Sequence, residues 1–249
     1  MISCVLCTYG RHTSVRKSMA MFLAQTWKQK ELVIFNTAEV PLVLGDFPGS
    51  SQVKVVNQTA RANGKPFKSL GDVRNAALPH ADGDLFVCWD DDDLFLPHHL
   101  KQSITAWIRA GTFAWKPQKS FFSNDGGVTF KYAQNAMEAS IMVDMAFVRE
   151  HGFSTSQSGG EHVQGGWLDK ALAQGQLTIE EVTPRESYAY VWGDGLSKTS
   201  GNIDHPNNFE NHKEASQDFG EGVLLVPVDL KELKPLFQAT ERVSGTHTF

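Results

Sequence analysis

Four consecutive carboxylates, Asp90 to Asp93, follow the apolar run LFVCW at residues 85–89. Like charges this close repel one another, and each is costly to remove from water. Two interpretations are open at this point. The aspartates form a solvated acidic turn that caps a helix, or they face something positive. On an extended backbone Asp90 and Asp92 share one face.

Polar residues also stand at the ends of two other apolar runs. Thr8 and Tyr9 end ISCVLCTY, and Asn36 ends ELVIFN. In an open parallel sheet, ligands bind outside the carboxyl ends of the strands. We therefore expect these residues and the aspartates to meet in one crevice.

The elements that must position these residues alternate between continuous apolar strands and helical patterns. Ser69, followed three residues later by Asp72, gives one helix a start that resembles a capping box. The alternation predicts an α/β domain over residues 1–110, with a mostly parallel sheet covered by helices on both faces. The expected strands are 2–9, 31–36, 52–58 and 85–89, and the expected helices are 13–26, 69–81 and 97–110, the last with Pro97 in its first position.

Residues 111–249 form the second half of what we expect to be one globular unit. The expected elements are a hairpin over 121–132, a strand at 138–144 leading into a helix at 145–152, a helix at 167–175 and a strand at 187–192. A polar segment at 193–212 lacks apolar periodicity, as functional lids or disordered segments do. A strand and a short amphipathic helix are expected in 222–238.

Composition limits the class of protein. Apolar residues make up 41% and charged residues 20% of the 249, enough for a sizeable core. The net charge of −5 argues mildly against a nucleic-acid partner. Cys4 and Cys7 would point to opposite faces of a strand, and three cysteines lack a disulfide framework. With neither a leader-like start nor an apolar run of membrane-spanning length, we expect a cytoplasmic protein without stable membrane insertion.

Four segments in order resemble the family 2-type glycosyltransferases of the GT-A fold. They cover about two thirds of the chain and carry the family's opening strand, its helix-to-strand passage, its R-N and D-x-D-D-x-x-x-P core, and its acceptor-side strand. These segments are CVLCTYGR (4–11), LAQTWKQKELVIFN (23–36), SLGDVRNAALPHADGDLFVCWDDDDLFLP (69–97) and EASIMVDMAFVREHGF (138–153). The resemblance implies a GT-A, Rossmann-like sheet with a nucleotide-sugar-binding half at 1–110 and a smaller acceptor-binding half at 111–249.

The resemblance also implies a nucleotide-diphospho-sugar donor and a divalent cation, Mn²⁺ or Mg²⁺, that bridges its phosphates. Hard oxygen ligands suit these ions. Asp90 and Asp92 correspond to the D-x-D pair, with Asp92 the foremost metal ligand and Asp93 the next. Asp91 holds the position that the family leaves variable; we group it with the donor-binding residues, although it could simply face away.

Other donor-binding residues follow from the same resemblance. Thr8, Tyr9 and Arg11 lie in the nucleotide loop, where a tyrosine ring can lie against a base. Arg74 and Asn75 match the R-N pair, and an arginine offers a planar fork to phosphate or ribose oxygens. A core tyrosine and a surface arginine are the alternatives.

Two departures from the family pattern concern the base and the catalytic proton acceptor. Asn36 and Thr37 stand where the family has paired acids, so Asn36 would meet the base with both a donor and an acceptor. The E-D dyad is missing from GGEHVQGGWLDKAL. Glu161 or His162 is the nearest equivalent for accepting the acceptor's proton, with Asp169 a further candidate or a surface residue.

Several histidines and tryptophans have weaker assignments. His205, beside Asp204 in the polar segment, is a candidate third metal ligand. Two interpretations are open for Trp115, Trp167 and Trp192: they stack on sugar rings, or they lie in the core. We expect His98 and His99 to lie on the surface of a helix.

The sequence therefore predicts a metal-dependent, inverting glycosyltransferase of the hexosyltransferase type. The alternatives are a nucleotidyltransferase, which the single glycine of TYGRHTS disfavours, and a non-catalytic nucleotide- or sugar-binding module. The acceptor is open: a glycan, a lipid-linked sugar, a protein, a small molecule or a modified DNA base.

Overall fold

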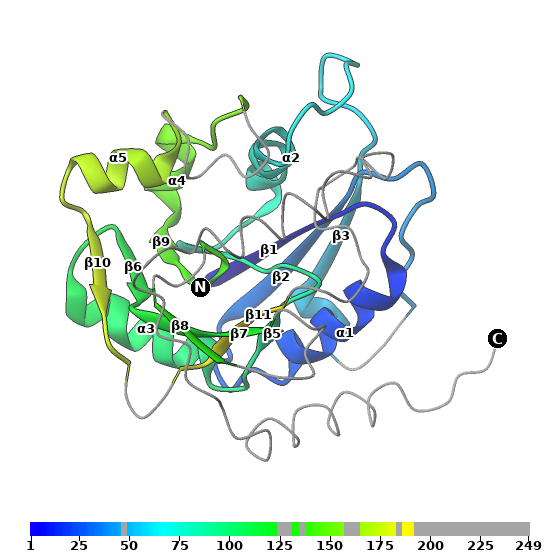
Figure 1. Ribbon diagram of the computed structural model, residues 1–249. Helices are drawn as coiled ribbons and strands as arrows, with labels where there is room; N and C mark the ends of the chain where they lie inside the picture. Colours follow the sequence, from blue (N-terminus) through cyan, green and yellow to red (C-terminus); the bar gives the residue numbers. More distant parts are fainter. Residues whose placement is uncertain (46–48, 124–130, 135–137, 157–164, 183–185, 192–249) are drawn as a thin grey trace.

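A seven-stranded sheet forms the centre of the protein, which a computed structural model describes over residues 1–45, 49–123, 131–134, 138–156, 165–182 and 186–191 (Figure 1). The strand order is β10-β6-β9-β4-β1-β2-β3. Neighbouring strands run parallel except at β9, which is antiparallel to β4 and β6. The strands are β1 (Ile2–Thr8), β2 (Lys30–Asn36), β3 (Val53–Asn57), β4 (Leu85–Cys88), β6 (Ala114–Pro117), β9 (Met142–Asp144) and β10 (Leu177–Glu180).

Helices cover both faces of this sheet. On one side lie α2 (Leu70–Ala77), α4 (Met145–His151) and α5 (Trp167–Ala173), and on the other lie α1 (His12–Leu23) and α3 (His99–Ala110) (Figure 1). Short 3₁₀ turns occur at η1 (Ser50–Gln52), η2 (Leu78–His80) and η3 (Glu138–Ser140). The expected mostly parallel α/β architecture is confirmed.

A second, four-stranded sheet has the order β5-β11-β7-β8. Its strands are β5 (Leu94–Phe95), β7 (Lys119–Ser123), β8 (Lys131–Gln134) and β11 (Tyr188–Val191). Because β5 begins directly after Asp93, this small sheet holds the far side of the aspartate run.

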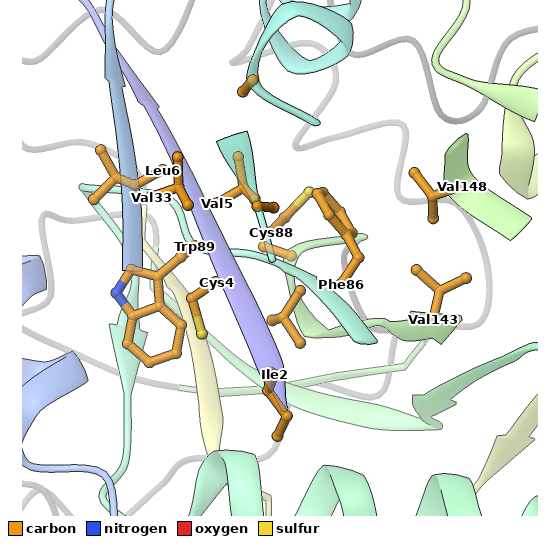
Figure 2. Packing of buried hydrophobic residues seen from close by; sticks show 14 of the residues in the cluster. Ile2, Cys4, Val5, Leu6, Val33, Phe86, Cys88, Trp89, Val143 and Val148 are labelled. Carbon is orange, nitrogen blue, oxygen red and sulfur yellow. The ribbon is translucent and has the colours of Figure 1, made fainter. Parts of the chain in front are cut away.

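The hydrophobic core surrounds the central strands. Every residue of β2 is buried, as is every residue of β1 except the half-buried Cys7. Figure 2 shows side chains of β1, β2, β4 and β9 in this core, among them Val5, Val33, Phe86 and Val143. Cys4 and Cys88 are buried thiols, and burial raises the pKa of Cys4 well above its usual range. Strands as fully buried as β1 and β2 are typical of a parallel sheet covered on both faces.

Most expected elements are present with small shifts of their ends. The Ser69 hydroxyl accepts a hydrogen bond from the Asp72 amide at 3.1 Å, as the capping pattern predicts. The helix expected from Pro97 begins at His99 instead, because the Pro97 carbonyl accepts the Thr26 amide and the His99 amide bonds to Leu96 in a turn. Among the described helices, none combines the length and apolarity needed to cross a membrane.

Two strands of the central sheet, β6 and β10, were not expected. Each has only four residues, and their sequences AWKP and LTIE lack a long apolar run. The second half of the chain thus contributes β6, β9 and β10 to the same sheet that the first half begins.

Candidate functional site

The aspartate run lies at the carboxyl end of β4, beside the parallel strand β1. Trp89, the residue before the run, stacks on Phe95 with ring centroids 3.8 Å apart. Its indole nitrogen donates to the Ser18 carbonyl (3.2 Å), and the Ser18 hydroxyl donates to the Asp90 carbonyl (3.2 Å). Helix α1 and the Trp89 ring therefore fix the backbone from which the four carboxylates extend.

Asp90 and Asp92 are the two aspartates that face the neighbouring arginines from partly open positions. The Asp90 side chain is 30% exposed and lies 3.5 Å from the Arg74 guanidinium. The Asp92 side chain is 9% exposed and accepts a hydrogen bond from Arg11 Nη1 at 3.0 Å. The two residues expected as the D-x-D pair thus lie beside Arg74 and Arg11, and their role as metal ligands stays a prediction.

Asp91 does not face away from the site. Its side chain is fully buried, Thr8 Oγ1 donates to its Oδ2 at 2.8 Å, and Arg11 Nη2 lies 2.5 Å from its Oδ1. Burial raises the Asp91 pKa to about 7, although Arg11 and the Thr8 hydroxyl act in the opposite direction. Thr8 and Arg11, both expected in the donor loop, thus contact the position that the family pattern leaves variable.

Asp93 makes its bonds on the side of the small sheet. Its Oδ2 accepts the Tyr188 hydroxyl at 2.5 Å, and its Oδ1 accepts the Val191 amide at 3.1 Å. Burial and the nearby Asp93 charge raise the Tyr188 pKa well above its usual range. The described contacts give Asp93 a structural task, and a metal-ligand role for it stays an untested prediction.

Arg11 carries its charge between two carboxylates. Burial lowers the Arg11 pKa, but Asp91, Asp92 and Asp90 raise it by more, so it stays above its ordinary value. The guanidinium of Arg74, on α2, lies 5.6 Å from the centre of the Phe153 ring as well as beside Asp90. Two arginines therefore border the aspartate run.

Asn75, the expected partner of Arg74, holds the turn after α4 rather than the aspartates. Its Oδ1 accepts the Phe153 amide and its Nδ2 donates to the Phe153 carbonyl, both at 2.8 Å. Gly152 precedes this contact with a φ of 65°, and a Cβ there would lie 3.1 Å from Asn75 Oδ1. A direct role for Asn75 in donor binding stays a prediction.

Asn36 ties together the loops at the carboxyl ends of β1 and β2. Its Oδ1 accepts the amides of Gly10 (3.1 Å) and Ala38 (3.3 Å). Its Nδ2 donates to the Val40 carbonyl (3.1 Å) and to Asn57 Oδ1 (2.8 Å). With both ends of the amide engaged and the residue fully buried, Asn36 shapes the loop and does not present its amide to a ligand.

A cleft of about 450 Å³ opens beside this loop. The Tyr9 residue, 45% exposed, forms one wall, and Glu39 and His12 supply polar groups that the sequence interpretation missed. The signal for Glu39 was available, since it is an acid three residues after the end of β2. The lining residues are Tyr9, Gly10, His12, Ala38, Glu39 and Val40.

The remaining candidates divide into described and undescribed positions. Asp169 lies in the first turn of α5, where its carboxylate accepts the Gly165 amide at 3.2 Å. Trp115 and Trp167 are buried core residues. Outside the described residues lie Glu161, His162, Trp192, Asp204 and His205.

His99 corrects the expectation of a helix-surface residue. It is buried among the rings of Trp89, Phe95 and Tyr188, and its Nδ1 lies 3.0 Å from the Ser187 hydroxyl. Burial lowers its pKa to about 3. The helix begins two residues later than expected, which turns His99 toward the small sheet.

The carboxylates suit a divalent cation that binds together with a phosphate ligand. Asp90 and Asp92 offer the hard oxygen atoms that Mg²⁺ and Mn²⁺ prefer. Among the described residues, no three His, Cys, Asp or Glu side chains are grouped as a complete metal site. A cation here would complete its coordination with phosphate oxygens and water, which is the usual arrangement for Mg²⁺.

Comparisons with solved structures show that the protein has a GT-A fold. Staphylococcus aureus TarS 1–349 in complex with UDP is 13% identical with a TM-score of 0.54, over 84% of this chain and 62% of that one. The mannosyltransferase PcManGT from Pyrobaculum calidifontis, in complex with GDP-Man and Mn²⁺, is 13% identical with a TM-score of 0.55, over 98% and 70%. Glucosyl-3-phosphoglycerate synthase from Mycobacterium tuberculosis, in complex with Mn²⁺, UDP and glucosyl-3-phosphoglycerate, is 14% identical with a TM-score of 0.51, over 76% and 71%.

The family model described as "Glycosyl transferase family 2" matches residues 3–115, a stretch that contains three of the four segments on which the resemblance rests. A comparison with curated proteins finds no match. The chain spans about 62% of the length of the TarS 1–349 structure, and at these identities the structural likeness establishes the fold.

Proposed function

We propose that this protein is a metal-dependent, inverting glycosyltransferase that moves a hexosyl group from a nucleotide-diphospho-sugar to an acceptor. The observation that carries the proposal is the meeting of three strand ends. After β4, Asp91 accepts a hydrogen bond from Thr8 at the end of β1, and Asp92 pairs with Arg11. The cleft bounded by Tyr9 and Glu39 opens where β1 and β2 end. Such a crevice at the carboxyl ends of parallel strands is where α/β sheets bind ligands.

Residues at these strand ends have separate roles in binding the donor. The nucleoside enters the cleft, with its base against the Tyr9 ring and its polar edge toward Glu39. Arg11 and Arg74 offer guanidinium groups to the phosphate oxygens, which they can bind in pairs. Asp90 and Asp92 would hold Mn²⁺ or Mg²⁺, which when bound offsets the negative charge of the diphosphate leaving group.

In the reaction, an acceptor oxygen forms a bond to the anomeric carbon as the bond from that carbon to the diphosphate oxygen breaks. The acceptor's proton passes to Glu161 or His162, with Asp169 as the further candidate. His205 is the proposed additional metal ligand. A single displacement of this kind inverts the anomeric centre.

We propose the donor and the acceptor by chemical class. The complexes of TarS with UDP and of PcManGT with GDP-Man support testing both uridine and guanosine diphosphate sugars. The acceptor is a glycan, a lipid-linked sugar, a protein, a small molecule or a modified DNA base. The three free cysteines support a reducing, cytoplasmic location.

The test is release of nucleoside diphosphate from a panel of nucleotide sugars with Mn²⁺, using wild type, Asp92→Asn and Asp84→Asn. Asp84 is a matched control because it precedes β4, at the opposite end of the strand from Asp92, and its side chain is exposed. We expect Asp92→Asn to lose about a hundredfold or more in rate, since the charge that holds the cation is removed, and Asp84→Asn to keep the wild-type rate.

Three other outcomes would redirect the proposal. Nucleotide binding without turnover of any donor would favour a binding module. Release of pyrophosphate from a nucleoside triphosphate and a sugar phosphate would favour a nucleotidyltransferase. The absence of both binding and turnover across the whole panel would contradict the proposal.

A further inference from the structure

Arg11 already places a positive charge on the carboxylates that the proposed function assigns to donor and cation. Its Nη2 lies 2.5 Å from Asp91 Oδ1, and its Nη1 lies 3.0 Å from Asp92 Oδ2. The Asp91 side chain is fully buried and that of Asp92 is 9% exposed, so little water screens the pair of contacts. A divalent cation bound to Asp92 would lie close to the Arg11 guanidinium, and two positive charges this close repel one another.

We propose that Arg11 is an internal counter-cation of Asp91 and Asp92 that competes with the divalent metal. When metal and donor bind, Arg11 moves to the donor's diphosphate. This inference rests on the proposed function, because it concerns the same site. It adds an order of exchange: one cation leaves the carboxylates as the other arrives.

The burial of Asp91 explains why its ionised carboxylate needs a cation beside it. A buried carboxylate without a charged partner is strongly unfavourable. Besides Arg11, the neutral Thr8 hydroxyl contacts Asp91 and donates to its Oδ2. While Asp91 is ionised, departure of Arg11 is therefore favourable only when another positive charge replaces it.

The position of Arg11 allows such a movement. The residue precedes α1 and follows Gly10, whose φ is 68°, at the border of the cleft lined by Tyr9, Gly10 and His12. Its side chain is 28% exposed, whereas that of Arg74 is 6% exposed and packs on Phe153. Of these two arginines, Arg11 has the freer path to a diphosphate in the cleft, and its planar fork suits paired phosphate oxygens.

The test measures Mn²⁺ binding to the full chain without nucleotide, from the electron paramagnetic resonance signal of unbound Mn²⁺. The variants are wild type, Arg11→Gln, Arg11→Lys and Arg16→Gln. Arg16→Gln is the matched control, since Arg16 is an exposed arginine of α1 and its replacement changes the net charge equally. Asp92→Asn identifies the site, because its Mn²⁺ binding should be lost.

We expect Arg11→Gln to lower the Mn²⁺ Kd by about tenfold, because the variant lacks the charged contact of Arg11 with the carboxylates that opposes metal binding. Arg16→Gln should leave the Kd unchanged. In saturating Mn²⁺, Arg11→Gln should weaken UDP or GDP binding, because the diphosphate loses a partner. Arg11→Lys keeps the charge that a folded Asp91 requires, and it should also bind Mn²⁺ more tightly than wild type because an ammonium cannot pair with both carboxylates as a fork.

An unchanged or weaker Mn²⁺ affinity in the Arg11 variants, with binding intact in wild type, would overturn the exchange and leave the proposed function standing. Loss of Mn²⁺ binding in every variant, wild type included, would overturn the exchange and the metal dependence together. Donor turnover measured on the same samples distinguishes failure of the exchange from failure of the transferase function.

Discussion

The Tyr188 hydroxyl donates a hydrogen bond of 2.5 Å to Asp93, across 95 residues of sequence. The same carboxylate accepts the Val191 amide, so two groups of β11 bind the last of the four aspartates. Because Asp93 is joined to Asp92 by one peptide bond, the small sheet determines where the acidic loop ends. The geometry of Asp90 to Asp92 therefore depends on a strand from the far half of the chain.

Tyr188→Phe should destabilise the protein by about 1–3 kcal/mol, because it leaves a buried carboxylate oxygen without its donor. Urea unfolding followed by fluorescence measures the change. Tyr9→Phe removes a hydroxyl from a half-exposed tyrosine and should stay within about 0.5 kcal/mol of wild type. Equal stability of the two variants would show that the Tyr188 bond contributes nothing.

His99 should make the protein sensitive to acid. Its pKa is about 3 when folded and about 6.5 when unfolded, so between these values the unfolded chain binds the extra proton. Stability from this residue is complete above about pH 6.5 and is lost as the pH falls toward 3. Between pH 7 and pH 5 wild type should lose about 2 kcal/mol more than His99→Gln.

Urea midpoints at the two pH values test this expectation, with His12→Gln as the control because His12 is exposed. The control should follow the wild-type slope. If His99→Gln also follows it, the acid sensitivity has another source.

Asn36→Ala should be among the more damaging single changes in the loops. It removes the acceptor of the Gly10 and Ala38 amides and the donor to the Val40 carbonyl, and each buried group left unsatisfied costs about 1–3 kcal/mol. The Asn57 side chain loses one bond but keeps its two bonds to Leu42. Asn63→Ala, which removes one acceptor from an exposed turn, should cost far less. Thermal melting compares the stability of the two variants. Similar losses of stability would show that the hydrogen bonds of Asn36 are no more important than that of Asn63.

Tyr9→Ala should weaken nucleotide binding while leaving the fold intact. Stacking of a base on an aromatic ring contributes about 1–3 kcal/mol, so the Kd for UDP or GDP should rise about tenfold or more. Titration calorimetry with Mn²⁺ measures the effect. Val43→Ala, at an exposed residue that does not line the cleft, should bind as wild type does. An unchanged Kd for Tyr9→Ala would place the base elsewhere.

The sequence was sufficient for the parts of the site that depend on local pattern. Continuous apolar strands placed Thr8, Asn36 and Asp90 at strand ends, and a parallel sheet brings such ends to one edge. The helix start at Ser69 was equally local, since a cap and its partner lie three residues apart.

Other features depend on contacts between distant residues, and no local pattern encodes them. The bond between Asp93 and Tyr188 and the burial of His99 against Ser187 arise only when β11 pairs with β5. Strands β6 and β10 are too short to show a pattern, and their positions come from pairing with β9 and with each other. Asn36 looked like a ligand-binding residue because its type and place fit, yet neighbouring backbone groups engage its amide.

Strand β9, three residues long, has a consequence for how the protein opens. It alone pairs with both β4 and β6 among the described strands, so it joins the β4-β1-β2-β3 group to the β6-β10 pair. A local unfolding event at β9 would separate the sheet into two units that can fluctuate independently. Amide hydrogen exchange should therefore differ between the two units. The amides of β1 and β2 should exchange most slowly, and those of β6 and β10 should share a lower free energy of opening.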